Sequence, residues 1–243
     1  MAGSASEDRA MRPHIPHLDT ESMDWTSPIP GLYSKVLSLD PDNGARTAIQ
    51  RLVPAEGYTA PTVPHYHHSA EEILVLGGKL SFDSKTYLGA KGYCFHPPET
   101  VHGFQSDVPE ETMFLSRHSK KMCTHDVPEP AKREYYPLTG KMPDRAWAAL
   151  PNAAADGWEG NVKVLGEDSH GEGSKLMRFD GDKVNLSVPE VFYEEIYVLD
   201  GSLTTADGET FAKGAYAFCP PGCDRPSFAT AKKALVYVNY GPA

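Results

Sequence analysis

The chain has 243 residues, enough for one large or two modest domains that each bury a core. Its formal net charge of −10 argues against nucleic acid as a partner, because binding to phosphates requires a basic face. No apolar run approaches the length that spans a bilayer, and basic residues form no patch for a membrane surface. The first residues lack the charged-then-apolar order of a signal peptide, so we expect a cytoplasmic protein.

Residues 1–22 are polar and rich in Ser, Pro and charged side chains, which predicts a flexible or loosely attached arm. From Trp25 onward, short alternating runs are separated by turn residues and predict a series of strands. Their spacing favours an all-β sandwich or barrel.

The main functional motif is a histidine-rich stretch. His65 and His67 are two residues apart, so on a strand their side chains point to the same face. Glu71 follows after a short bend, and His102 comes from a separate run that also has strand character. Three neutral imidazoles and one carboxylate form a ligand set for a divalent metal, with room left for water or substrate.

Two other interpretations of this stretch stay open. If the strand is out of phase by one residue, His68 and Glu72 are the alternative ligands, although strand alternation favours the first set. The stretch could also be a metal-free cluster on a solvated loop.

The spacing resembles the first cupin motif, a paired histidine H-x-H followed by a glutamate and a glycine, here His65, His67, Glu71 and Gly78. The segment PPETVH that ends at His102 resembles the second motif, usually P-P-G-x-x-H. Glu99 replaces the glycine of that motif, so we expect a differently shaped turn. The run is most similar to cupins of the ChrR type. The resemblance implies a small double-stranded β-barrel with the metal inside it, and it is more specific for the fold than for the reaction.

The second half of the chain repeats the first at a constant offset of 123 residues, with 194–201 matching 71–78 and 218–222 matching 95–99. We therefore predict two tandem cupin barrels of the double-stranded β-helix, or jelly-roll, type. The predicted boundaries are an arm over residues 1–22, an N-terminal barrel with the metal site over 23–118, a Pro-rich linker over 119–156, and a C-terminal barrel over 157–243.

The same offset places four residues of the second half where the first half has its predicted ligands: Val188, Glu190, Glu194 and Arg225. A usable imidazole is missing at these positions, and the permanent charge of Arg225 would repel a divalent ion. We expect Arg225 to pair with Glu194 or Glu190, against a two-carboxylate metal site or a solvated arrangement. The second barrel would then be structural, a dimer-forming surface or a cover for the first site.

Residues around the predicted barrel mouth are candidates for binding substrate. Ile73 and Val75 share a face with Glu71 and would form an apolar floor. The other candidates are an aromatic wall of Tyr93, Phe95 and Phe104, and the polar group of Gln50, Arg51 and His96. For the aromatic residues the competing interpretation is ordinary barrel core, and for Arg51 an exposed strand position.

By resemblance, the site implies one divalent transition metal, with Fe(II) preferred and Zn, Mn, Ni or Cu as alternatives. We expect a dioxygenase that acts on a small oxygenated or carbonyl-containing molecule, with no catalytic residue assigned beyond the ligands. Isomerase or lyase chemistry at a Lewis-acidic metal such as Zn, and non-catalytic sensing of a small molecule or metal, are the alternatives. Cupin barrels often pair through their outer sheets, so the resemblance also implies a homodimer.

The four cysteines lack CxxC spacing, and a chain of this length does not depend on disulfides for stability. Cys219 and Cys223 flank a Pro-Pro-Gly turn, which could bring them near one another. We expect all four to be reduced thiols: Cys94, Cys123, Cys219 and Cys223.

Overall fold

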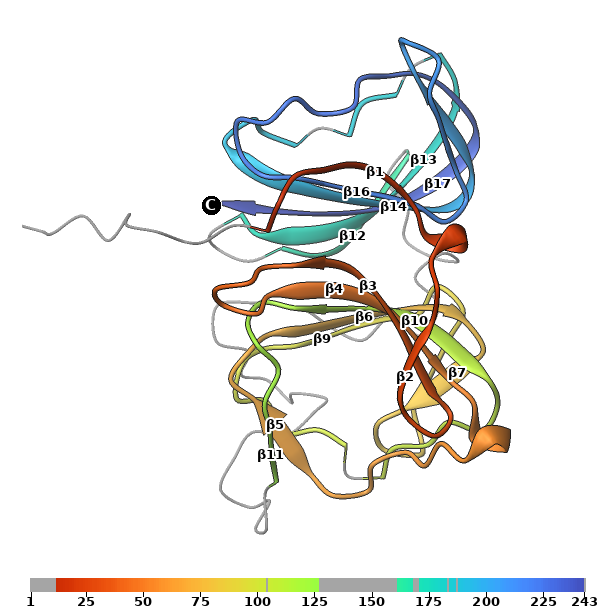
Figure 1. Ribbon diagram of the computed structural model, residues 1–243, viewed down its shortest axis with the longest axis vertical. Helices are drawn as coiled ribbons and strands as arrows, with labels where there is room; N and C mark the ends of the chain where they lie inside the picture. Colours follow the sequence, from red (N-terminus) through yellow and green to blue (C-terminus); the bar gives the residue numbers. More distant parts are fainter. Residues whose placement is uncertain are drawn as a thin grey trace, which may run out of the picture.

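The computed structural model describes residues 12–103, 105–126, 161–167, 171–182, 184–186 and 188–242. These residues form strands and two 3-10 turns, η1 (Thr20–Ser22) and η2 (Pro54–Glu56), with no α-helix among them. The all-β class predicted from the sequence is confirmed. Figure 1 shows two β lobes stacked one above the other, which is compatible with the two predicted barrels.

The lower lobe in Figure 1 contains a six-stranded antiparallel sheet in the order β2-β3-β4-β10-β6-β9. Two short antiparallel ribbons, β5 with β11 and β7 with β8, complete the lobe. The strands are β2 (Thr26–Ile29), β3 (Leu32–Leu39), β4 (Arg46–Leu52), β5 (His65–His67), β6 (Glu71–Gly77), β7 (Lys79–Ser81), β8 (Tyr87–Gly89), β9 (Tyr93–His96), β10 (Thr112–His118) and β11 (Thr124–Asp126).

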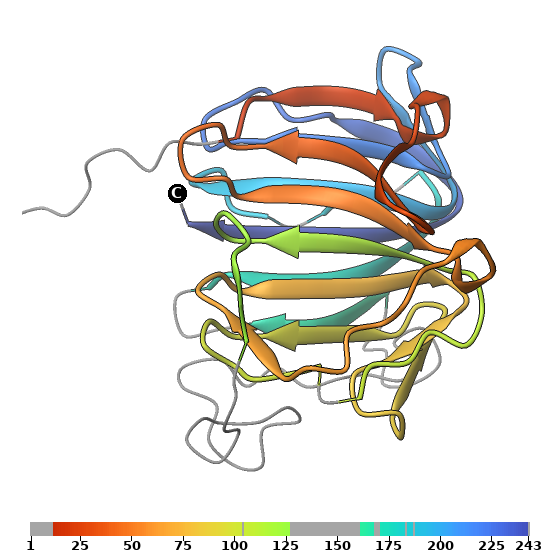
Figure 2. The same ribbon diagram turned by 60° about the horizontal axis from the view of Figure 1, so that its bottom comes forward.

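The upper lobe contains a seven-stranded antiparallel sheet in the order β1-β16-β14-β17-β13-β12, with β15 paired to β14. Figure 2 shows the strands of the two sheets running in similar directions, as in aligned face-to-face packing. The strands are β1 (Ile15–Asp19), β12 (Val162–Glu167), β13 (Gly173–Gly181), β14 (Phe192–Thr205), β15 (Thr210–Ala212), β16 (Ala215–Cys219) and β17 (Phe228–Pro242).

The N-terminal segment crosses to the second lobe. The sequence predicted a flexible arm over residues 1–22, but Ile15–Asp19 forms β1, which pairs with β16 of the upper sheet. Ahead of β1, Arg12 is buried and binds Glu195. The prediction is wrong for residues 12–22, because a polar composition does not prevent an edge strand from pairing where a partner strand is available. Residues 1–11 lie outside the described part.

The predicted linker over residues 119–156 also differs at its start. Thr124–Asp126 forms β11 and pairs with the histidine strand β5, so the lower lobe extends beyond residue 118. Residues 127–160 lie outside the described part, and the rest of the linker prediction falls there.

Strand alternation distributes the apolar side chains over three cores. One core lies inside the lower lobe and includes Ile73 and Val75, and a second lies inside the upper lobe. The third joins the lobes, because Leu74 of β6 packs with Tyr237 of β17 in one cluster. Each sheet therefore presents one face to its own lobe and the other face to the neighbouring sheet.

The 123-residue repeat is visible in the strand register. Glu71 lies opposite His96 in the pair β6–β9, and Glu194 lies opposite Cys219 in the pair β14–β16. The next residue of each strand, Glu72 or Glu195, turns toward the other lobe, as alternation requires. Two glutamates at equivalent positions thus meet in the buried space between the sheets.

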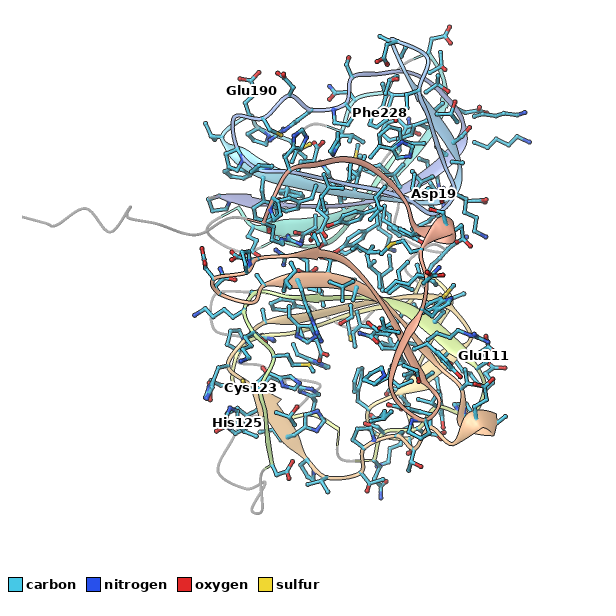
Figure 3. All side chains as sticks on the ribbon, in the orientation of Figure 1. Asp19, Glu111, Cys123, His125, Glu190 and Phe228 are labelled. Carbon is cyan, nitrogen blue, oxygen red and sulfur yellow. The ribbon has the colours of Figure 1, made fainter. Side chains whose placement is uncertain are left out.

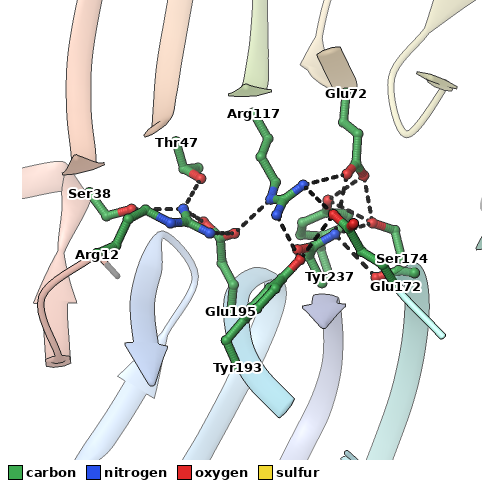
Figure 4. Close-up of polar contacts among 12 residues, drawn as sticks. Arg12, Ser38, Thr47, Glu72, Arg117, Glu172, Ser174, Tyr193, Glu195 and Tyr237 are labelled. Atoms are coloured by element: carbon green, nitrogen blue, oxygen red, sulfur yellow. Dashed lines mark hydrogen bonds and ion pairs between the residues drawn. The ribbon is translucent and has the colours of Figure 1, made fainter. Parts of the chain in front are cut away.

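A buried polar network joins these two glutamates (Figure 4). Tyr93 donates to Glu72 at 2.8 Å, and Tyr216 donates to Glu195 at 2.7 Å, so the repeat extends to the partners. Arg117 lies between the carboxylates, 2.8 Å from Glu72 and 3.3 Å from Glu195. Because each charge has an opposite charge and hydrogen bonds, the network fixes how the lobes sit on each other.

Candidate metal centre

The histidine strand β5 provides two of the predicted ligands. His65 and His67 point to the same side, with ring centroids 5.2 Å apart. His102 joins them because its backbone pairs with that of His65 through two hydrogen bonds of 2.9 Å. The ring nitrogens of the three histidines include one set of atoms within 4.8 Å of each other, close enough to converge on one ion.

Glu71 begins β6 and extends its carboxylate to the same place. One oxygen lies 3.3 Å from His102 Nε2 and 3.0 Å from His96 Nδ1, and the other lies 3.7 Å from His118 Nε2. Glu71, His96 and His102 form a second group of converging ligand atoms, which shares His102 with the first. The structure therefore gathers all four predicted ligands, and it adds two histidines at their edge.

Of these two histidines, sequence reasoning placed His96 among the substrate contacts and missed His118. His118 ends β10 directly opposite Glu71 in the β6–β10 register, and its ring centroid lies 6.0 Å from that of His67. Strand alternation was the available signal, since Phe114, Ser116 and His118 all face the lower-lobe cavity.

Hydrogen bonds fix the orientation of the three predicted imidazoles. The Nδ1 atoms of His65, His67 and His102 each face a backbone carbonyl, of Val63, Cys123 and Thr100, at 3.0, 3.2 and 3.0 Å. A carbonyl only accepts, so each Nδ1 must carry the proton, and each Nε2 keeps its lone pair for a metal. This tautomer is the one that a metal-binding histidine needs.

The charge state of the cluster also suits a divalent cation. Burial, followed by the neighbouring ring of His102, lowers the pKa of His65, and burial lowers that of His67, so both rings are neutral at pH 7. Burial alone would raise the pKa of Glu71, but the neighbouring imidazoles of His102 and His96 hold it well below its usual range. Neutral imidazoles and one carboxylate are a donor set that binds Fe(II), Zn(II) or Mn(II).

The alternative ligands point elsewhere. The His68 side chain is 58% exposed and pairs with Glu99 on the outside of the lobe. Glu72 faces the neighbouring lobe in the network of Figure 4. The strand phase favoured by the sequence is therefore the one that the structure has.

The turn before His102 keeps the conformation of the motif it resembles. Glu99 has φ = 68°, and Gly222 at the equivalent position of the second lobe has φ = 76°. Our expectation of a differently shaped turn is wrong. A glutamate in this left-handed region costs about 1 kcal/mol relative to glycine, and its pairing with His68 offsets part of that cost.

A cavity of about 390 Å³ opens beside the ligands inside the lower lobe. Its walls combine apolar side chains, such as Ile73 and Phe82, with a few polar ones. Two polar atoms stand out, because Arg46 Nε and Gln50 Oε1 are buried and have no hydrogen-bond partner in the described structure. A buried polar atom without a partner costs about 1–3 kcal/mol, so both atoms are available to a ligand.

Several predicted substrate contacts are placed elsewhere. Tyr93 and Phe95 lie opposite Leu74 and Glu72 in the β6–β9 register, so they face the core between the lobes. Arg51 lies on the other face of β4 from Gln50 and pairs with Glu111. These predictions are wrong because the strand faces were assigned without the pairing partner. Among the remaining candidates, Ile73 lines the cavity, Val75 is buried in the core of the lobe, His96 contacts Glu71 and Phe104 lies outside the described residues.

In the second lobe, Arg225 takes the position that His102 has in the first. Its guanidinium lies 3.7 Å from Glu194 and donates to the carbonyls of Val188 and Pro189, so the predicted ion pair is present. Glu190 is exposed at the outer edge of the lobe (Figure 3) and does not take part. Burial raises the pKa of Glu194, and the charge of Arg225 opposes that rise.

Acid is expected to destabilise the metal-free protein. Burial lowers the pKa of His96 and of His118 to about 4. Unfolded imidazoles titrate near 6.5, so between pH 6.5 and pH 4 the unfolded chain binds more protons than the folded chain. The free energy of unfolding therefore decreases as the pH is lowered through this range. The full difference is on the order of 3 kcal/mol for each ring. Urea unfolding in the presence of a chelator, at pH 7 and at pH 4.5, measures this loss of stability. His118→Asn should make the free energy of unfolding less dependent on pH. Equal stability at the two pH values would contradict the neutral buried rings.

The fold and this cluster together define a metal-binding β protein of the cupin type. Residues 16–121 match the family model of the ChrR cupin-like domain. A sequence comparison with curated proteins finds no match. None of the described helical segments is long and apolar enough to cross a membrane.

Similar solved structures extend over nearly the whole chain. A candidate dioxygenase from Nostoc punctiforme has a TM-score of 0.73 at 20% identity, covering 96% of this chain and 84% of its own. The protein YlbA from E. coli has a TM-score of 0.58 at 15% identity, covering 98% and 95%. Oxalate decarboxylase from Bacillus subtilis has a TM-score of 0.54 at 14% identity, covering 93% and 76%. At these identities the likeness shows the fold alone.

Proposed function

We propose that the lower lobe is the active site of a metal-dependent dioxygenase that oxidises a small oxygenated or carbonyl-containing molecule. The ligands would be His65, His67, Glu71 and His102, with Fe(II) as the preferred metal. The observation that carries the proposal is the set of three imidazoles whose Nδ1 atoms are each anchored on a backbone carbonyl beside a single carboxylate. When bound there, Fe(II) supplies redox chemistry with O2 and coordination positions for an oxygen-bearing substrate.

The cavity beside the ligands suggests what the substrate looks like. Its volume of about 390 Å³ suits a small organic molecule, and its apolar walls exclude water from the reacting atoms. Arg46 would bind an enolate or carboxylate oxygen through its guanidinium, and Gln50 Oε1 would accept a hydrogen bond from a hydroxyl group. The substrate class is therefore a compound with an anionic oxygen near a hydroxyl or enol. The candidate dioxygenase among the similar folds is in keeping with this chemistry.

Oxygen uptake by the Fe(II)-loaded protein tests the activity. We expect a carbonyl or diphenol compound from a panel to be consumed together with O2. Arg46→Met should lower kcat/KM by roughly 10- to 100-fold, since a charge-assisted hydrogen bond is worth about 1.5–3 kcal/mol. Arg51→Met is the matched control, because Arg51 lies on the same strand but faces away from the cavity and should leave kcat/KM unchanged.

Other outcomes would point to other functions. Turnover of a carbonyl compound by the Zn(II)-loaded protein without O2 uptake would replace the proposal with isomerase or lyase chemistry. If no compound turns over with Fe, Mn, Ni, Cu or Zn, while some raise the melting temperature, the lobe binds small molecules without reacting them.

A further inference from the structure

A second group of potential metal ligands lies in the upper lobe, and it contains none of the residues of the first site. His14 Nε2 lies 3.6 Å from the sulfur of Cys219, and Cys223 contributes a third atom. Each pair of these three ligand atoms is within 4.8 Å. Cys219 is buried, Cys223 is half-buried and His14 is exposed, so the group is open to solvent on one side.

The fold brings these three residues together by strand pairing and a turn. Ile15 of β1 lies opposite Phe218 of β16, which places His14 next to Cys219 at the end of the same antiparallel pair. The turn after β16 then reverses the chain, since the amide of Cys223 donates to the carbonyl of Pro220 at 3.3 Å. The crossing of the N-terminal segment to the second lobe is therefore what supplies the imidazole.

The group lies at the end of the upper lobe that corresponds to the first metal site. Cys219 is paired with Glu194, as His96 is paired with Glu71 in the lower lobe. The cation of Arg225 is engaged by Glu194 and by the carbonyls of Val188 and Pro189. Burial, then Cys223 and Glu194, raise the pKa of the Cys219 thiol, and the charge of Arg225 opposes that rise. This lobe has thus lost most of the nitrogen ligands of the first site and gained sulfur ligands.

We propose that His14, Cys219 and Cys223 bind one Zn²⁺ ion, which makes the chain a protein with two metal sites of different chemistry. Tetrahedral Zn²⁺ with Zn–S of about 2.3 Å and Zn–N of about 2.05 Å puts a sulfur and a nitrogen ligand roughly 3.6 Å apart. The distance between His14 Nε2 and Cys219 has this value without any movement. Two thiolates and one imidazole leave the fourth position to water.

A Zn²⁺ ion at this place would have a structural consequence. It would link the segment before β1 to the turn after β16 and so hold the crossing N-terminal segment on the upper lobe. Both thiols must lose their protons to bind it, so binding releases protons and weakens in acid.

Cobalt substitution tests the proposal independently of the first site. Co(II) is added to the full-length protein, reduced and freed of metal, and the thiolate-to-cobalt charge-transfer band in the near ultraviolet is recorded. We expect two equivalents to bind and one to give this band. Cys223→Ser should weaken the band, because only the Cys219 thiolate is left, and His14→Ala should weaken Co(II) binding at this site by more than about 10-fold. His14 is exposed and Cys223 is only partly buried, so neither change removes core packing.

Two matched variants complete the design. Cys123→Ser alters the exposed cysteine of the lower lobe and should leave the band unchanged. His65→Ala/His67→Ala removes ligands of the first site, and the band should persist, so failure of the proposed dioxygenase function does not affect this result. Absence of the band in the wild-type protein, an unchanged band in Cys223→Ser or its loss in Cys123→Ser would each overturn the proposal.

Discussion

Replacing His102 with alanine is expected to weaken metal binding in the lower lobe strongly. His102 belongs to both groups of converging ligand atoms, and its Nε2 lies 3.3 Å from an oxygen of Glu71. Its loss removes one ligand and also releases the carboxylate. We expect Fe(II) or Mn(II) affinity to fall by more than about 100-fold, beyond the 10- to 100-fold cost of losing an outer hydrogen-bond partner. Isothermal titration of the metal-free protein measures the change.

His68→Ala is the matched control for this measurement. His68 is in the same histidine run, one residue beyond His67, but its ring lies on the outside and pairs with Glu99. Its replacement should leave the affinity within about 2-fold, because a surface ion pair is worth only about 0–1 kcal/mol. If His68→Ala lowered the affinity as much as His102→Ala, the strand phase would be wrong and the alternative ligand set would be correct.

The faces on which the candidate ligands lie could be predicted, because they depend on the shortest-range property of a strand. Residues two apart share a face whatever the strand pairs with, so His65 with His67, and Glu71 with Ile73, follow from the sequence alone. The pairing of Arg225 with Glu194 followed from the repeat, since equal sequence offsets gave equal places in the two lobes.

The errors occurred where a position depends on a distant partner. Tyr93 and Phe95 alternate correctly, but which of their faces is inside the lobe is set by the register with β6. The ordering of residues 12–19 depends on β16, some two hundred residues away, and the local sequence contains no signal of that pairing. The pattern of one strand shows which residues share a face, but only the pairing within the sheet shows which face points into the lobe.

Because the lobes pack on each other, alternate residues of one strand lie in different environments. Along β6, Glu71 and Ile73 face the metal site, while Glu72 and Leu74 face the other lobe. The metal-site face and the interface face therefore share one backbone. The polar network around Arg117 is the part of this interface that can be tested by a single substitution.

Arg117→Met is expected to be the most destabilising of the substitutions considered. Arg117 is buried and bridges Glu72 and Glu195, and it also donates to Tyr193 at 2.7 Å. Removing it leaves the buried carboxylate of Glu72 without a counter-charge, while Glu195 keeps Arg12. An uncompensated buried charge costs about 3–5 kcal/mol. For a chain of this size the melting temperature should fall by roughly 6–20 °C, measured by calorimetry.

Arg51→Met serves as the control, because Arg51 pairs with Glu111 at the surface and should cost no more than about 1 kcal/mol. The penalty at Arg117 should come from the uncompensated charge, and not from lost packing. Adding Glu72→Gln to Arg117→Met removes the uncompensated buried charge and should therefore recover part of the lost stability, although Glu72→Gln alone destabilises. Additive losses in the double variant would mean that the network does not hold the lobes together through charge.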